Sequence, residues 1–455
     1  MTAPLAPVLC LGAFVRAALY ALPSVHQILS TRPELVTAVT SFRRVQEGVY
    51  LFQATGSPYS GDVFHQPPLL FALLYPLLEL VPPILQYSAT CAAFILVDLL
   101  IAVGFSRLCR RTLHLEEGRE PKVHETTIWL SQIPVSPLFQ PKNLPITVAF
   151  VYLLNPYSLA SGIAMSTVSF THLAVLYSLV FASEGALAAS MMCLAVGTYL
   201  SVYPFFLVVP IVLLLRDVKC SKVVADTNDD NQTGGAGPSV LQLAVGCLVT
   251  LSVWLSLLLY LSWSLSGDWG FLEETYVWVA KYSDLTPNVG IFWYFFMEIF
   301  DRFIPYFLFV MHLHPCIYVV PIYLRMAHRP QAYACALIGI FSLFQAYSSF
   351  GDFSFFLSML ALHPKTIMTI ENRFAYVLGL GVATCMLPVM WFLWLFPASG
   401  NANFFYNQTL VYQVFNSQII TAFVSASMKR DKDVDKYRVS CLKEANAANE
   451  AEASK

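Results

Sequence analysis

Charged residues are scarce in this chain: Asp, Glu, Lys and Arg make up 12% of its 455 residues, about half the share in an average globular protein. Apolar residues make up 57%. So little charge cannot cover the surface of a soluble protein of this length, whereas a bilayer span needs about 20 mainly apolar residues. The composition therefore predicts an all-α, polytopic membrane protein, with apolar runs for about 12 transmembrane helices.

Motifs for metal binding and for nucleophilic catalysis are also lacking. The ten cysteines form no C-x-x-C pair, and none lies in a Cys/His cluster with metal-ligand spacing. The sequence contains no nucleotide-binding glycine loop and no Ser/His/Asp series. We therefore expect no metal site, no cofactor, no disulfide framework and no catalytic residues of these types.

Apolar runs divide the chain into predicted spans. Residues 1–430 are expected to form a single polytopic membrane domain, and residues 431–455 a disordered tail. The spans are predicted at residues 5–22, 88–106, 146–161, 168–184, 186–202, 204–216, 240–263, 304–324, 331–347, 351–363, 374–397 and 405–426.

The distribution of Lys and Arg orients these spans. Both residues are frequent in segment 107–145 and in the C-terminal tail but rare in segment 264–303, so the positive-inside rule makes the first two cytosolic and the third, aromatic loop lumenal. The same rule places both termini and the linker 217–239 in the cytosol. Segment 23–87 becomes a lumenal loop with interfacial helices. Within it, the proline-interrupted residues 69–87 are predicted to be re-entrant, because a full crossing would put segment 107–145 on the wrong side.

One stretch, residues 284–298, is neither a clean span nor a soluble loop. Its first half carries turn chemistry in Asp284, Pro287, Asn288 and Gly290. Its second half is a block of aromatic residues, of the kind enriched where a membrane meets water. Two interpretations are open: an aromatic belt that closes a lumenal loop, or a site for a lipid with a polar head.

Four stretches carry a family resemblance: residues 56–65 followed by Pro68 and Leu69, residues 154–157, residues 284–296 and residues 401–406. They resemble subunit U of the glycosylphosphatidylinositol (GPI) transamidase, the phosphatidylinositol-glycan class U family. The resemblance implies a non-catalytic subunit in the endoplasmic-reticulum membrane that binds and presents the GPI lipid for attachment to proteins. It also implies partners, namely a cysteine protease-like catalytic subunit and membrane or lumenal scaffolding subunits, and no nucleic acid.

The resemblance further implies the GT-C type scaffold of glycosyltransferases that use dolichol-phosphate-mannose. Those enzymes carry acidic residues just after the first span, where a carboxylate serves as general base. Here residues 22–42 offer only Glu34, and the first Asp of the chain is Asp62. We therefore expect no enzymatic activity. A dolichol-phosphate-mannose-dependent mannosyltransferase of GPI or glycan assembly is the alternative, and a transporter or scramblase is disfavoured because no internal repeat is evident.

Polar and aromatic residues in the matching stretches are the candidates for lipid contact. Asn401 and Asn403 present amide groups that suit phosphate or sugar hydroxyls, or else they cap the last span. His65 is either a lumenal acid or base or a hydrogen-bonded structural histidine. The candidate GPI-binding or lipid-binding residues are Asn401, Asn403, Phe404, Asp284, Asn288, Trp293, Tyr294, Tyr59 and His65.

Overall fold

The computed structural model of the protein describes residues 5–119, 136–227 and 239–453. Over these residues every regular element is helical, which confirms the predicted all-α class. The α-helices are α1 (Ala6–Tyr20), α2 (Pro23–Leu29), α3 (Phe42–Thr55), α4 (Pro68–Glu79), α5 (Pro83–Arg119), α7 (Leu144–Leu154), α8 (Pro156–Ile163), α9 (Val168–Glu184), α10 (Leu187–Leu200), α11 (Val208–Thr227), α12 (Val240–Ser266), α13 (Trp278–Lys281), α14 (Phe292–Glu298), α15 (Ile304–Ile317), α16 (Val319–Met326), α17 (Pro330–Phe344), α18 (Phe350–Leu360), α19 (Pro364–Met368), α20 (Arg373–Leu395) and α21 (Ala402–Ala453). Short 3₁₀ turns are η1 (Pro137–Phe139), η2 (Tyr203–Leu207) and η4 (Asp301–Phe303), and η3 (Glu273–Val277) is a π-helix.

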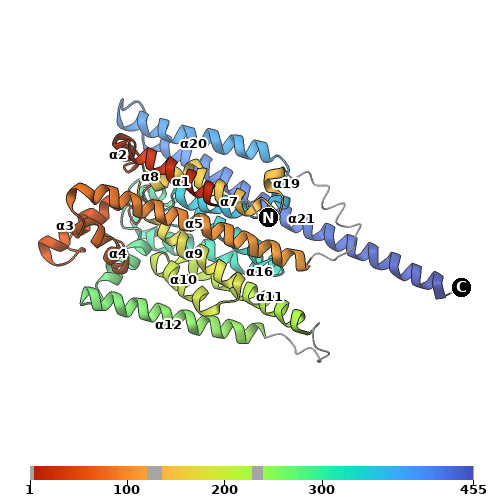
Figure 1. The fold of residues 1–455 in the computed structure, drawn as a ribbon. Helices are drawn as coiled ribbons and strands as arrows, with labels where there is room; N and C mark the ends of the chain where they lie inside the picture. Colours follow the sequence, from red (N-terminus) through yellow and green to blue (C-terminus); the bar gives the residue numbers. More distant parts are fainter. Residues whose placement is uncertain (1–4, 120–135, 228–238, 454–455) are drawn as a thin grey trace.

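The long helices run side by side in one bundle (Figure 1). The short helices α2, α3 and α4 gather at one end, called here the α2–α4 end, and the two chain ends lie toward the other. The main core is built from α5, α7, α9, α11, α17 and α18. Helices α12 and α20 lie at opposite edges of the bundle, and only 17% of the most apolar part of each is buried, as expected for surfaces that face lipid.

Each predicted span falls on helix, but helix length alone does not establish twelve crossings. Among the described residues, four helical segments are long and apolar enough to cross a bilayer: Pro83–Leu115, Val240–Ser266, Asp301–Met326 and Arg373–Leu395. The bent pairs α1/α2 (89°) and α7/α8 (51°) raise the number to six at most. Helices such as α17 are too short to span a bilayer alone, but they are enclosed by protein on nearly every side, where short helices are tolerated at membrane depth. The number of crossings therefore stays a prediction.

Helices bend and end where the local residue types favour it. The bend between α7 and α8 lies at Asn155-Pro156, where proline removes a backbone donor. The Asn155 side chain accepts a hydrogen bond from the Tyr157 backbone N–H at 3.0 Å and so caps the new helix. Helix α12 ends at Gly267, whose φ of 80° is a left-handed conformation that glycine adopts without steric cost.

Two predicted loops are shorter than expected, and the predicted tail continues a helix. Helix α5 extends to Arg119, so only residues 120–135 of the predicted segment 107–145 lie outside the described residues before η1. Helix α11 extends to Thr227, and residues 228–238 of the predicted linker lie outside them too. The tail, expected to be disordered, continues α21 to Ala453. Its Ala, Glu and Lys residues are strong helix formers.

Helices α2, α3 and α4 fold the long first loop back onto the bundle. Helix α3 lies within the loop in which interfacial helices are predicted, and it buries Phe42, Val45 and Val49. Helix α4 has 12 residues, about 18 Å, which is shorter than the hydrocarbon core of about 30 Å. Residues 83–87 of the predicted re-entrant segment belong to the start of α5, and whether residues 69–87 cross the membrane stays a prediction.

A buried ion pair joins three of the helices. Arg16 on α1 donates from Nε to Asp98 Oδ2 on α5 at 2.7 Å, and from Nη1 to the Leu153 carbonyl on α7 at 2.8 Å. The Tyr152 hydroxyl donates to the other Asp98 oxygen at 2.9 Å. Both charged side chains are at most 3% exposed, so each needs these partners inside the bundle.

Candidate functional site

The polar half of residues 284–298 is a loop held by its own side chains. Asp284 Oδ1 accepts from the Thr286 backbone N–H at 2.8 Å, and Asn288 Oδ1 accepts from the Gly290 N–H at 2.7 Å. The Asn288 amide also donates to the Tyr282 hydroxyl at 3.0 Å. These contacts are the turn chemistry that the sequence predicts. Asn288 is buried, so it shapes the loop from inside.

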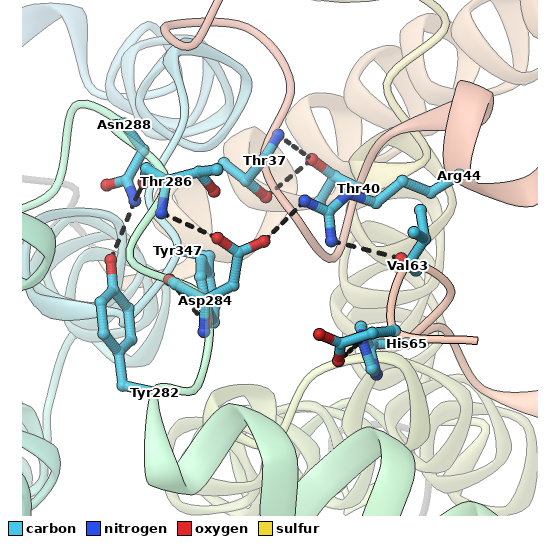
Figure 2. Close-up of polar contacts among 11 residues, drawn as sticks. Thr37, Thr40, Arg44, Val63, His65, Tyr282, Asp284, Thr286, Asn288 and Tyr347 are labelled. Carbon is cyan, nitrogen blue, oxygen red and sulfur yellow. Dashed lines mark hydrogen bonds and ion pairs between the residues drawn. The ribbon is translucent and has the colours of Figure 1, made fainter. Parts of the chain in front are cut away.

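Asp284 ties this loop to the first loop of the chain (Figure 2). Arg44 on α3 donates from Nη2 to Asp284 Oδ2 at 2.6 Å and from Nη1 to the Val63 carbonyl at 3.2 Å. Burial by itself raises the pKa of Asp284, but hydrogen bonds from Thr286 and Arg44 outweigh it and lower the pKa below its usual value. Asp284 is therefore a charged anchor between distant segments.

The aromatic half forms α14 and packs inward. Trp293 is completely buried. The centroid of its ring lies 6.1 Å from that of the Phe405 ring and 5.6 Å from that of the Tyr406 ring. Tyr294 is half-buried and stacks on Tyr406 at 4.7 Å. The Tyr406 hydroxyl donates to the Ile291 carbonyl at 3.1 Å. The predicted aromatic belt is thus largely a packing contact between α14 and α21, and only Tyr294 of the two candidates reaches the surface.

The start of α21 carries the most accessible candidates. Asn401, Asn403 and Phe404 are all exposed, and Phe404 is 54% exposed. Asn401 Oδ1 accepts from the Phe404 backbone N–H at 3.3 Å, so the capping alternative holds for Asn401. Asn403 lies in the first helical turn, so the pair does not adopt the extended geometry that would aim both side chains alike.

A stack of rings connects His65 with the 284–290 loop. The His65 and Trp278 rings stack at 3.7 Å, Trp278 and Tyr347 at 5.7 Å, and Tyr347 and Tyr282 at 4.6 Å. The Tyr347 hydroxyl donates to the Asp284 carbonyl at 3.2 Å. His65 therefore belongs with the polar half of the stretch.

The loop also reaches α21. The Gln413 side-chain amide on α21 donates to the Val289 carbonyl at 2.6 Å. Tyr59 lies within the first loop, where its hydroxyl donates to the Gln66 carbonyl at 2.7 Å. The nine candidates thus form two groups joined by the 284–291 loop: Tyr59, His65, Asp284 and Asn288 on one side, and Trp293, Tyr294, Asn401, Asn403 and Phe404 on the other.

A cavity of about 430 Å³ lies beside the first group. Of the nine candidates only His65 lines it, together with His172, His312, Gln345 and Asp352, which were not among them. The sequence signal for Asp352 and His172 was an ionisable residue within an apolar run. Gln345 carried no comparable signal. In the described parts of the chain, no group of three or more His, Cys, Asp or Glu side chains could hold a metal ion.

Comparison with known proteins gives matches over nearly the whole chain. The family model described as GPI transamidase subunit PIG-U matches residues 10–412. The chain is 30% identical over 434 residues to the GPI-anchor transamidase component PIGU of Homo sapiens and to that of Cricetulus griseus, covering 95% of each protein. It is 29% identical over 417 residues to the GPI transamidase component GAB1 of Saccharomyces cerevisiae, covering 90% of this chain and 91% of that protein.

Proposed function

The chain belongs to the family of GPI transamidase subunit PIG-U, and from this membership we propose that it is a component of a GPI transamidase that binds and presents the GPI lipid. The observation that carries the lipid-binding role is the exposure of Asn401, Asn403 and Phe404 together at the start of α21. Two amides can hydrogen-bond to phosphate or sugar hydroxyls, and the adjacent phenyl ring can contact a hydrocarbon chain.

The neighbouring aromatic contacts would fix this surface in place. Tyr406 on α21 stacks on Tyr294 and bonds to the Ile291 carbonyl, so the start of α21 is held against α14. A rigid surface loses less entropy when it binds a flexible lipid. Holding the acceptor amine of the lipid beside an acyl-enzyme on another subunit would turn a bimolecular step into an effectively unimolecular one.

The carboxylates nearest the first span support a non-catalytic role. Glu34 is buried and bonded to Arg32 through both carboxylate oxygens, at 2.6 and 3.0 Å, so its charge is already used in an ion pair. The Asp62 side chain is fully exposed, so the protein does not hold it in the enclosed, fixed geometry that a general base needs beside its substrate. In this proposal the transfer chemistry belongs to a cysteine protease-like partner subunit.

The exposed apolar helices support a multi-pass protein that assembles with other membrane subunits. Helices α12 and α20 bury only 17% of their most apolar windows within this chain, which leaves wide apolar faces for lipid or partner helices. We place the α2–α4 end in the lumen of the endoplasmic reticulum and both termini in the cytosol. The positive-inside rule gives this orientation, and the chain ends lying toward one end of the bundle agree with it.

The decisive experiment replaces Asn401 and Asn403 with Ala together, in cells that lack the endogenous protein. Because two hydrogen bonds to the lipid head would be lost, we expect GPI-anchored proteins at the cell surface to fall by about tenfold or more. Asn407→Ala is the matched control, since Asn407 is an exposed residue one turn further along α21. Full rescue by the double variant, with normal assembly into the complex, would remove this surface from lipid binding.

A further inference from the structure

A cleft at the α2–α4 end is lined mainly by polar and aromatic residues. It lies among α2, the start of α3, the start of α5 and the residue that follows α8. None of Asn401, Asn403 or Phe404 lines it, so it is separate from the surface proposed for the GPI lipid. Its volume of about 420 Å³ falls within the usual range for small-molecule sites. A ligand of its own is therefore sterically possible.

The cleft carries one positive charge and no carboxylate. Among the described residues that line it, Arg43 is the only Lys or Arg, and none is Asp or Glu. The Arg43 side chain is exposed and forms no ion pair within the described part of the chain, although Glu47 lies one turn further along α3. The neighbouring Arg44, by contrast, is bonded to Asp284. Arg43 therefore offers the cleft a guanidinium group that is free to bind an anion.

Ser41 adds a hydroxyl group that has no partner. The residue is 8% exposed and directly precedes α3, yet its side chain forms no capping hydrogen bond. The Gln66 amide bonds to the Ser41 carbonyl at 3.0 Å and leaves the hydroxyl free. Within the described residues Ser41 Oγ is neither hydrogen-bonded nor fully enclosed, so the surface that it keeps opens into the cleft. A nearly buried hydroxyl of this kind calls for a ligand or a water molecule.

The first turn of α3 brings unpaired backbone donors to the same wall. Helix α3 begins at Phe42, and the N–H groups of Phe42 and Arg43 have no acceptor among the described residues. The helix is 14 residues long, and its N-terminus is the positive end of its dipole, where an anion is stabilised. The Ser41 hydroxyl, these N–H groups and the Arg43 guanidinium thus supply donors for a phosphate from one short segment.

Helix α2 contributes a group that suits a hydroxyl. His26 Nδ1 lies 2.7 Å from the Ile163 carbonyl oxygen, which can only accept, so Nδ1 carries the proton and Nε2 of the neutral ring is an acceptor. This Nε2 has no partner in the described parts of the chain and is not fully enclosed. The exposed amides of Gln27 and Gln46 also line the cleft and can both donate and accept. The cleft can therefore bind hydroxyl groups beside a phosphate.

The position along α5 places the cleft at a membrane surface. Tyr87, which lines it, and Arg107 lie on this helix about 20 residues or about 30 Å apart, which is the thickness of a hydrocarbon core. The Arg107 side chain is 40% exposed, as expected for a charge at the opposite membrane surface. Helices α1 and α5 pack together between these levels, and Phe14 and Leu96 on them are 71% and 57% exposed. A lipid with its head in the cleft would find apolar surface for its chains.

We propose that this cleft binds the head of an anionic phospholipid, with its phosphate at Ser41 and Arg43 and a headgroup hydroxyl at His26 Nε2. Phosphatidylinositol and phosphatidylglycerol have this chemistry, namely a phosphodiester, one negative charge and free hydroxyl groups. The phosphoinositol part of a GPI lipid shares it, but the two sources differ in their dependence on Asn401 and Asn403. Binding of a phospholipid in the cleft does not depend on GPI binding at those two residues.

Photo-crosslinking to the purified complex in phosphatidylcholine nanodiscs tests this site. The probes are photoreactive phosphatidylinositol and photoreactive phosphatidylcholine with the same acyl chains. We expect phosphatidylinositol to label peptides from residues 12–30 or 83–100. Phosphatidylcholine should label them at least about fivefold less, because its head carries a cation beside Arg43 and has no hydroxyl group. Peptides from residues 240–266, on the exposed helix α12, report the background of unspecific lipid contact and should be labelled equally by both probes.

Two variants and a matched control locate the ligand. Arg43→Gln removes the cation at an exposed position and should reduce phosphatidylinositol labelling about tenfold. Gln46→Glu adds a negative charge with almost no change in shape and should also reduce labelling, with Arg43 intact. Arg302→Gln is the control, because Arg302 is an exposed arginine too but does not line the cleft.

Preferential labelling by phosphatidylinositol that falls in both cleft variants but not in Arg302→Gln would support the proposal. The proposal is overturned if both lipids label these peptides equally, if labelling persists in both cleft variants, or if the control lowers it as much. Recovery of each variant with the intact complex, measured by co-purification, verifies that the protein is folded.

The double variant Asn401→Ala/Asn403→Ala separates the two sources of phosphoinositol. Labelling of the cleft peptides should stay at the wild-type level in this variant, because neither residue lines the cleft. A loss of labelling there would assign the label to the GPI surface and overturn the cleft site. Because the readout is lipid labelling, failure of the cleft proposal would leave GPI-anchor attachment by the Asn401/Asn403 surface untouched.

Discussion

Arg44 Nη2 and Asp284 Oδ2 lie 2.6 Å apart although 240 positions separate the two residues in the chain. Their side chains are 20% and 16% exposed, so the pair is largely shielded from water. The contact joins α3 of the first loop to the loop that precedes α14 (Figure 2). Two segments that both match the family thus meet in one charged hydrogen bond at the α2–α4 end.

A double-mutant cycle measures how much the interaction between these two side chains contributes to the free energy of unfolding. We expect Arg44→Gln and Asp284→Asn to couple by about 1 kcal/mol in the free energy of unfolding in detergent, because the pair is partly buried and directly bonded. Glu273→Gln serves as the control, since the Glu273–Lys281 pair is about 60% exposed and should have no measurable effect. Strictly additive single effects would show that the two loops are held together by other contacts.

Acid should remove the stabilisation that Asp284 provides. Its pKa is lowered in the folded protein, and such a group stabilises above the unfolded pKa and loses its contribution as the pH falls through the folded pKa. The difference in stability between wild type and Asp284→Asn should be constant from about pH 7 to about pH 5 and should shrink below about pH 4. Chemical denaturation across this pH series measures it, and a difference that shrinks already near neutral pH would point to another titrating group.

The Arg16–Asp98 pair predicts a large asymmetry between single and double variants. Asp98→Ala should destabilise the protein by about 3 to 5 kcal/mol, because it leaves the Arg16 guanidinium buried without its anion. The double variant Arg16→Met/Asp98→Leu should be markedly more stable than Asp98→Ala. Glu184→Gln tests a more exposed pair, Arg107–Glu184, and should cost about 1 kcal/mol or less. Thermal unfolding of the purified complexes would reveal the order, and equal losses in all three would refute it.

Replacing Gly290 and Gly246 with alanine should change the stability of the protein in opposite directions. A Cβ at Gly290 would lie 2.8 Å from Asn288 Oδ1, the atom that binds the Gly290 N–H, so the turn must distort at a cost of about 1 to 3 kcal/mol. A Cβ at Gly246 meets nothing within 4 Å, and alanine there should stabilise α12 by about 0.5 to 1 kcal/mol. Stability in detergent and surface levels of GPI-anchored proteins are the two measurements. Wild-type values for Gly290→Ala would mean that the loop tolerates rearrangement.

Much of the candidate site could be anticipated from the sequence because its chemistry is local. Turn residues between Asp284 and Gly290 bond to neighbours two positions away, as their types predict. The capping role of Asn401 is local as well. By contrast, the burial of Trp293 depends on Phe405 and Tyr406, more than a hundred positions away, and no local pattern distinguishes a packed aromatic residue from an interfacial one.

Hydrophobic runs and turn residues act over a few positions, and the matching stretches span the chain, so the helical class, the apolar segments and the family could be read from the amino-acid sequence alone. Which candidates lie together depends on how the chain folds. It separated His65 from Asn401 and Asn403, linked Arg44 to Asp284, and enclosed a cavity among helices distant in sequence. Side-chain packing between remote segments makes these contacts, and such packing leaves no periodic signal in a single sequence.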